Sequence, residues 1–163
     1  MNFVEEVLVK LRQEAAPPPL QALVLHKPVG SNTYCGPAAY AILTGKTTAE
    51  ASLCMRRILR RSAIKGVPPW ALELALLRSG VKMAVHYRRH GDNFRDKPKY
   101  NLRQFAIQYP KSVYLVMVTN HYLVIDTRSA PPVIADSREY LRPIDKSSNR
   151  LKRVVTAWRI FAQ

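Results

Sequence analysis

The sequence predicts an α+β fold, with helices in the N-terminal half and antiparallel strands in the C-terminal half. Two patterns indicate this division. Up to Gly80, apolar residues recur at helical spacing between capping residues, prolines and glycines, whereas from Val81 onward they follow the two-residue period of strands or form continuous runs. A length of 163 residues suits one domain with its own core. We therefore expect a single domain over residues 1–163.

The N-terminal half is predicted to be mostly helical. Residues 1–19 are expected to form an amphipathic helix followed by a stiff spacer, because the last three of them are prolines. After an extended segment at residues 20–27, Pro37 and Gly45 favour a short helix that begins at Cys35, since proline suits a first turn and glycine the left-handed residue after the last one. The next predicted helices, which begin at a capping box or after prolines, span residues 48–62 and 70–79.

The C-terminal half is predicted to form the sheet. Residues 81–88 alternate apolar and polar side chains, as in a half-exposed strand, and residues 112–118 are continuously apolar, as in a central strand or a buried helix. Thr119 and Asn120 make the turn into a paired strand. The other predicted strands span residues 121–127, 133–135 and 154–161, and a short helix capped by Asn101 spans residues 102–109.

Cys35 is the candidate nucleophile. A thiol at a helix N-terminus faces the positive end of the helix dipole and several unpaired N–H groups, and both favour the reactive thiolate. The alternative is a buried cysteine that serves only as a small apolar residue. We expect that second role for Cys54, which lies within the apolar stripe of the helix at residues 48–62.

His121 and Asp136 are the candidate partners of this thiol. His121 begins a predicted hairpin strand, and Asp136 ends the next one, so neighbouring strands would carry both side chains to one end of the sheet. An imidazole can hold a thiolate as an ion pair and then protonate a leaving group, and an acid can fix the imidazole's tautomer. Asp126 is a weaker candidate for that acid, because an odd separation along the strand places it on the face opposite to His121.

Two short stretches resemble a known family. They are Cys35-Gly36-Pro37-Ala38-Ala39, and Asn120-His121-Tyr122-Leu123-Val124 followed by Ala135-Asp136. Over residues 29–136 the chain is similar to the papain-like cysteine peptidase superfamily, nearest to the branch that processes bacteriocin leaders after a double glycine. The resemblance implies a helical half packed on an antiparallel sheet and a catalytic triad of Cys35, His121 and Asp136. It also implies a protein or peptide substrate.

The resemblance has one departure, at the site that binds the oxyanion. The bacteriocin-processing branch has a glutamine six residues before its cysteine, where this chain has Val29. Asn32, three residues before Cys35, is the candidate replacement, because the position is similar to one that lines the oxyanion site in ovarian-tumour-type deubiquitinases. The backbone N–H of Cys35 would be the other donor. Loss of one oxyanion donor costs about 2.7 to 4 kcal/mol of barrier.

The charge of the chain predicts a second property. Its net charge is +15 and its pI is near 10.3, and the basic residues concentrate between residues 56 and 103. Such a surface attracts nucleic acids and other polyanions, although a solvated basic face without a partner has the same composition. The candidate polyanion-binding residues, all arginines of a predicted helix or of the segment after residue 87, are Arg56, Arg57, Arg60, Arg61, Arg88 and Arg89.

Several classes of function are disfavoured by the sequence. The histidines and cysteines show no metal-ligand spacing, and no glycine-rich phosphate loop is present, so neither a metal nor another cofactor is expected. No run is apolar enough to span a membrane, and no signal peptide or disulfide framework is recognisable, so we expect an intracellular protein.

Three functions therefore remain open. The first is a hydrolase that cleaves a peptide or isopeptide bond, and the second is a catalytically inactive papain-like fold that binds nucleic acid or another polyanion. The third is acyl transfer by the same triad. The resemblance also points to bacteria and their viruses, in which such a protein is carried in the virion with packaged nucleic acid or acts on a host target. The sequence leaves the oligomeric state open.

Overall fold

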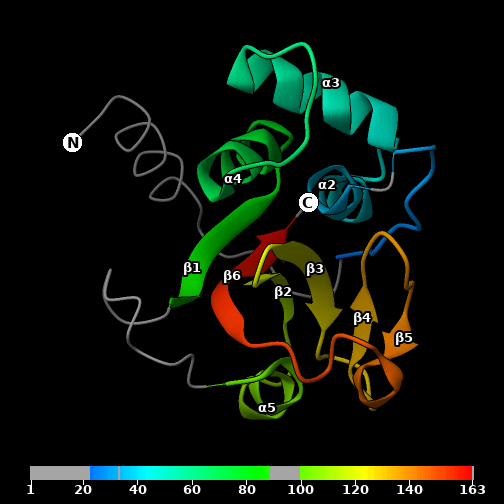
Figure 1. Ribbon diagram of the computed structural model, residues 1–163. Coiled ribbons are helices and arrows are strands. Elements are labelled where there is room, and N and C mark those ends of the chain that lie inside the picture. The colour runs from blue at the N-terminus through cyan, green and yellow to red at the C-terminus, as the bar shows by residue number, and fades with distance from the viewer. Residues whose placement is uncertain (1–22, 33, 89–99, 163) are drawn as a thin grey trace. The chain divides into compact units, whose positions relative to one another are not determined.

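The computed structural model describes residues 23–32, 34–88 and 100–162 (Figure 1). The predicted helix and spacer of residues 1–19 lie outside this part. Within it the chain has the predicted α+β composition: four α-helices, one 3-10 helix and six strands. They are α2 (Cys35–Thr44), α3 (Thr48–Leu59), α4 (Pro69–Arg78), β1 (Lys82–Arg88), α5 (Leu102–Gln108), β2 (Val113–Val118), β3 (His121–Asp126), β4 (Val133–Ala135), β5 (Arg142–Pro143), η2 (Ile144–Lys146) and β6 (Val154–Ala162).

The described part of the chain divides into two compact units: one lies within residues 1–84 and 160–163, and the other lies within residues 85–159. The predicted single domain over residues 1–163 stays a prediction. In the first unit α2, α3 and α4 contact one another (Figure 1). The segment at residues 23–27, predicted to be extended, forms no strand within the described residues, and the backbone N–H of His26 donates to the carbonyl of Ile42 at 2.9 Å.

Helix α2 is the buried helix of the first unit. Every residue from Gly36 to Leu43 is buried. Gly45 ends the helix as predicted: it has a φ of 71° and donates its N–H to the carbonyl of Ala41 at 2.9 Å. Gly36 allows a close approach, because a Cβ at this position would lie 2.8 Å from Cγ2 of Val67. The start of α2 is therefore held tightly by the segment between α3 and α4.

Helix α3 begins with the predicted capping box. The Thr47 hydroxyl accepts from the Glu50 N–H at 3.2 Å, and the Glu50 carboxylate accepts from the Thr47 N–H at 2.8 Å. The helix ends at Leu59, before the predicted Ser62, because Arg60 adopts the left-handed conformation with a φ of 52°. The core assignment of Cys54 is corrected: its side chain is only half-buried and lines an open cavity.

The six strands form one sheet in the order β1-β6-β2-β3-β4-β5. Strands β2 and β3 form the predicted hairpin, with Val118 opposite His121 and Val113 opposite Asp126. Asn120 in the turn has a φ of 54°, which asparagine tolerates better than most residues. Strand β5, which pairs antiparallel with β4, and the 3-10 helix η2 had no sequence signal, because each is only two or three residues long.

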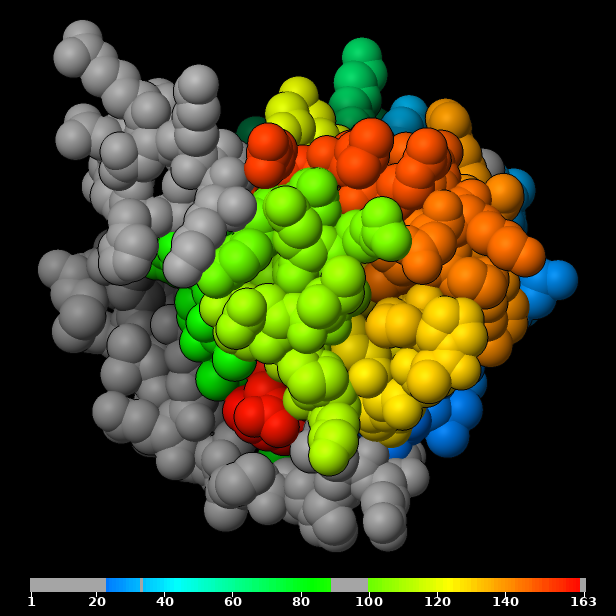
Figure 2. All heavy atoms as spheres, turned by 90° about the horizontal axis from the view of Figure 1, so that it is seen from below, coloured from blue at the N-terminus to red at the C-terminus, as the bar shows by residue number. Residues whose placement is uncertain are grey.

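Helix α5 covers one face of the sheet in the second unit. Phe105 of α5 is fully buried and packs in one cluster with Tyr114 of β2, Ile125 of β3 and Ile134 of β4. Figure 2 shows α5 beside the orange segment that contains η2, and Arg103 forms an ion pair with Asp145 at 2.7 Å there. Through this cluster α5 packs on β3, which carries His121, and on β4, which leads to Asp136.

Candidate functional site

Cys35 is the first residue of α2, as predicted, and its side chain is half-buried. Tyr34 before it has extended backbone angles, and its side chain makes no capping hydrogen bond. Pro37 has no amide proton, so the first two amides of the helix belong to Cys35 and Gly36. The thiol thus lies beside the backbone donors of a helix start, which is the setting that the sequence indicated.

Asn32 connects the segment before Cys35 to helix α3. Its amide nitrogen donates to the hydroxyl of Ser52 at 2.6 Å, and its amide oxygen accepts from the N–H of Tyr34 at 2.9 Å. One of the two amide protons is therefore engaged by Ser52. The role of Asn32 as an oxyanion donor stays a prediction that requires the second proton. Val29, at the position where the related branch has glutamine, is 63% exposed.

His121 and Asp136 form the predicted pair. Nε2 of His121 lies 2.9 Å from Oδ2 of Asp136. The register explains this contact: Val124 lies opposite Ala135, so Asp136 is level with residue 123 and diagonal to His121 on the same face of the sheet. The His121 side chain is 19% exposed and that of Asp136 only 1%. The pair thus has a buried acid and a histidine that reaches the surface.

Each carboxylate oxygen of Asp136 accepts two hydrogen bonds. Oδ1 accepts from the backbone N–H groups of Arg138 and Glu139, both at 2.7 Å, and Oδ2 accepts from Nδ2 of Asn149 at 3.0 Å besides its contact with His121. Burial raises the pKa of this carboxyl, but the hydrogen bonds from His121 and from the two backbone amides, with the charge of His121, outweigh it and lower the pKa below its usual value. Asp136 is therefore an ionised acceptor at neutral pH.

Asn149 is a site residue that the sequence analysis missed. It is 5% exposed, and it lies in a turn whose position is fixed by Glu139, since the Ser147 hydroxyl donates to the Glu139 carboxylate. Ser147 Oγ also accepts from the Asn149 N–H at 3.0 Å. In the sequence, the only sign of a site here is the polar run at residues 147–149, and such a run is typical of any exposed loop. Its burial depends on tertiary contacts with the loop after β4.

Asp126, the weaker candidate for the acid, has a different partner. Its carboxylate accepts from Nη2 of Arg128 at 2.7 Å and from Nε of the same side chain at 3.0 Å. Strand alternation predicted that Asp126 would not contact His121, and the observed partners of the two residues agree with this. Cys35 lies in the first unit, and the His121–Asp136 pair lies in the second.

The predicted polyanion-binding arginines are partly grouped. Arg57, Arg60 and Arg61 are exposed, and together with the half-buried Arg56 they line a shallow hollow at the C-terminal end of α3. Arg88 is exposed at the last residue of β1. Arg89 lies outside the described residues. Four of the six residues thus share one surface on α3.

In the described ranges, no group of three or more histidine, cysteine or acidic side chains is arranged to hold a metal ion. No helix of the described chain is both long and apolar enough to cross a bilayer.

The comparisons with known proteins leave the family open. No protein-family model matches the sequence, and a search of curated proteins finds no match. The likeness to papain-like peptidases therefore stays a prediction from the two sequence motifs.

Proposed function

We propose that the chain is a thiol hydrolase of the papain-like type, which cleaves a peptide or isopeptide bond. The observation that carries the proposal is the buried relay of His121, Asp136 and Asn149. Such a relay is expensive to bury and has a clear chemical use, because it fixes the orientation and tautomer of an imidazole that reaches the surface. A thiol at the start of a buried helix supplies the matching nucleophile.

In the proposed mechanism, His121 works through its two ring nitrogens in different ways. The N–H group at Nε2 donates a hydrogen bond to the carboxylate of Asp136, which stays ionised. Nδ1 takes the proton of the Cys35 thiol. The thiolate attacks the carbonyl carbon of the substrate. The oxyanion that forms accepts from the backbone N–H of Cys35 and from the second amide proton of Asn32.

The remaining steps release the two products. Nδ1–H of His121 gives its proton to the leaving amine as the C–N bond breaks, which leaves a thioester on Cys35. A water molecule then attacks this thioester, and Nδ1 takes one proton from the water. When the C–S bond breaks, the acid product leaves and Cys35 regains its thiolate beside the protonated imidazole. An amine in place of water would give acyl transfer by the same residues.

Turnover by variants tests the proposal. The protein is incubated with a mixed peptide library, and mass spectrometry detects new termini in the wild type, Cys35→Ala and Cys54→Ala. We expect cleavage by the wild type and by Cys54→Ala, and none by Cys35→Ala, with circular dichroism to show that each variant is folded. Cleavage by Cys35→Ala at the wild-type rate contradicts the proposal, and so does a wild type that cleaves no peptide and forms no thioester.

We propose as a second candidate function that the α3 arginine surface, formed by Arg56, Arg57, Arg60 and Arg61, binds nucleic acid. The specific observation is that these side chains gather around one hollow. Guanidinium groups pair well with phosphates. Binding to a duplex oligonucleotide is expected to fall steeply between 50 and about 200 mM salt, and to weaken in Arg60→Gln with Arg61→Gln but not in Cys35→Ala. An affinity that does not change with salt contradicts this function.

A further inference from the structure

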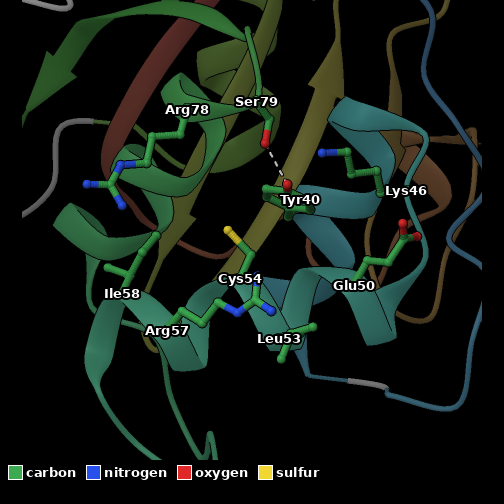
Figure 3. Close-up of a pocket in the computed structure, with 9 residues that line it drawn as sticks. All are labelled: Tyr40, Lys46, Glu50, Leu53, Cys54, Arg57, Ile58, Arg78 and Ser79. Carbon is green, nitrogen blue, oxygen red and sulfur yellow. Dashed lines mark hydrogen bonds between the residues drawn. The ribbon is translucent and has the colours of Figure 1, made fainter.

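The first unit contains an open cavity that the proposed hydrolase does not use. It has a volume of about 390 Å³, which falls in the range of pockets for small ligands. Residues of α2, α3 and α4 line it together with the residues that follow α2 and α4 (Figure 3). The sulfur of Cys54 points into the cavity in Figure 3. A cavity of this size, formed where three helices meet, has room for a bound organic molecule.

The charge of the cavity is positive. Lys46, Arg57 and Arg78 line it from three different parts of the chain, and Glu50 is the acidic residue of its lining. The Glu50 carboxylate already accepts from the N–H and the hydroxyl of Thr47, at 2.8 and 2.7 Å, and these bonds lower its pKa. The lining thus carries three positive charges against one negative charge. A ligand with two negative charges would balance it.

Neutral groups complete the lining. The hydroxyls of Tyr40 and Ser79 lie 2.5 Å apart, so one donates to the other and the accepting hydroxyl keeps a proton to donate elsewhere. Leu53 and Ile58 form an apolar part of the cavity wall. Nζ of Lys46 lies 6.0 Å from the centre of the Tyr40 ring. Hydroxyl and cationic donors beside apolar surface suit a phosphate group that is attached to an organic part.

We propose that this cavity binds a phosphate monoester. Two negative charges on one group match the excess of two positive charges, which a single carboxylate would not. The cavity shares Arg57 with the α3 arginine surface, and it shares Leu53 with the hollow that this surface lines. The phosphate therefore comes either from a free small molecule or from the end of a nucleic acid that lies on that surface, and the same contacts serve both.

Alkylation of Cys54 reports occupancy of the cavity directly. The full chain is labelled with N-ethylmaleimide, an uncharged reagent, and the labelling of Cys54 and Cys35 is measured by peptide mass. The additions are inorganic phosphate, adenosine monophosphate and a single-stranded oligonucleotide with or without a 5′-phosphate, each compared with sodium chloride at equal ionic strength. We expect the Cys54 rate to fall about tenfold at ten times the Kd, because only the unoccupied protein reacts.

Variants and the choice of ligand separate the outcomes. Arg78→Gln, which removes a cation of the cavity alone, is expected to abolish the protection, whereas Arg61→Gln, on the α3 arginine surface alone, is expected to retain it. Protection by adenosine monophosphate assigns a free ligand, and protection only by the 5′-phosphorylated oligonucleotide assigns a nucleic-acid end. Unchanged labelling with every phosphate, equal protection by sodium chloride, or full protection in Arg78→Gln overturns the proposal.

Discussion

Asp136 is the residue around which the polar cluster of the second unit is built. It accepts from two backbone amides, from Asn149 and from His121, so all its bonds are to donors. A carboxylate can accept all four hydrogen bonds with its two oxygens. An asparagine has only one oxygen, and its NH₂ group would point its protons at two of the neighbouring donors. The identity of this residue therefore matters for both the position of His121 and the local fold.

The substitution Asp136→Asn tests this account. For the proposed hydrolysis we expect kcat to fall by about 10⁴, as when an acid that sets a histidine's tautomer is replaced by its amide. We also expect the free energy of unfolding to fall by about 1–3 kcal/mol, because buried donors lose their acceptor. Asp126→Asn is the matched control, because Asp126 ends the same strand as His121 and pairs with Arg128. Equal loss of kcat in both variants would show that the pairing with His121 is not what matters.

At the scale of single residues, sequence reasoning found the pair but not its support. The alternation of strand residues and the spacing between His121 and Asp136 were enough to predict that they meet. Asn149 could not be found in this way, because its turn is placed by Glu139, whose burial depends on the packing of two loops. Cys54 was misassigned because a helical stripe predicts which face turns inward, not where a neighbouring helix leaves a cavity.

Among the elements, helix α2 has a position that depends on a small residue, Gly36. A Cβ on Gly36 would lie 2.8 Å from Cγ2 and 3.0 Å from Cβ of Val67, a short side chain that cannot move away easily. Overpacking of this kind costs about 1–3 kcal/mol. Gly36 directly follows Cys35, so the position of the proposed nucleophile depends on this close approach.

The substitution Gly36→Ala is expected to lower the urea midpoint of unfolding, because the strain outweighs the better helix propensity of alanine, about 1 kcal/mol. Gly66→Ala is the matched control: nothing lies within 4 Å of a Cβ there, so its stability is expected to stay the same or to rise by about 0.4–1 kcal/mol. A Gly36→Ala protein as stable as Gly66→Ala would contradict the close packing of α2.

Element boundaries were predicted best where a local motif sets them. The capping boxes of Thr47 with Glu50 and of Asn101 with Gln104 begin α3 and α5 as the sequence indicated. The end of α3 was wrong by three residues, since no residue type requires Arg60 to be left-handed. Strand β5 was missed because a two-residue strand is defined by its partner β4 and not by its own pattern.

At the scale of the whole molecule, the free energy of unfolding is expected to fall in two steps as the pH is lowered. Partial desolvation, with repulsion from Arg159, lowers the pKa of His86, an exposed residue of β1 whose ring packs edge-on against Tyr109 at 4.6 Å. The pKa of Asp136 is lowered as well. Because the unfolded chain binds protons more readily at both sites, the stabilisation is complete above each unfolded value and is lost as the pH falls through each folded value.

Thermal unfolding between pH 8 and pH 3 measures these steps. We expect Tm to fall slightly below about pH 6.5, because solvent screens the exposed His86, and more strongly below about pH 3.9, because Asp136 is buried. His86→Gln is expected to reduce the first decrease, and Asp136→Asn the second. A wild type and His86→Gln that lose the same Tm between pH 7 and pH 5 would contradict the assignment to His86.

In the proposed hydrolase, His121 activates Cys35. The direct measurement is the rate of iodoacetamide labelling of Cys35 from pH 5 to pH 9, resolved by peptide mass, with Cys54 as the internal comparison and His86→Gln as the control variant. We predict rapid labelling of Cys35 at pH values where a free thiol of pKa about 8.5 hardly reacts, and a slower rate in His121→Ala only. A Cys35 that follows the profile of a free thiol, unchanged in His121→Ala, would contradict the account.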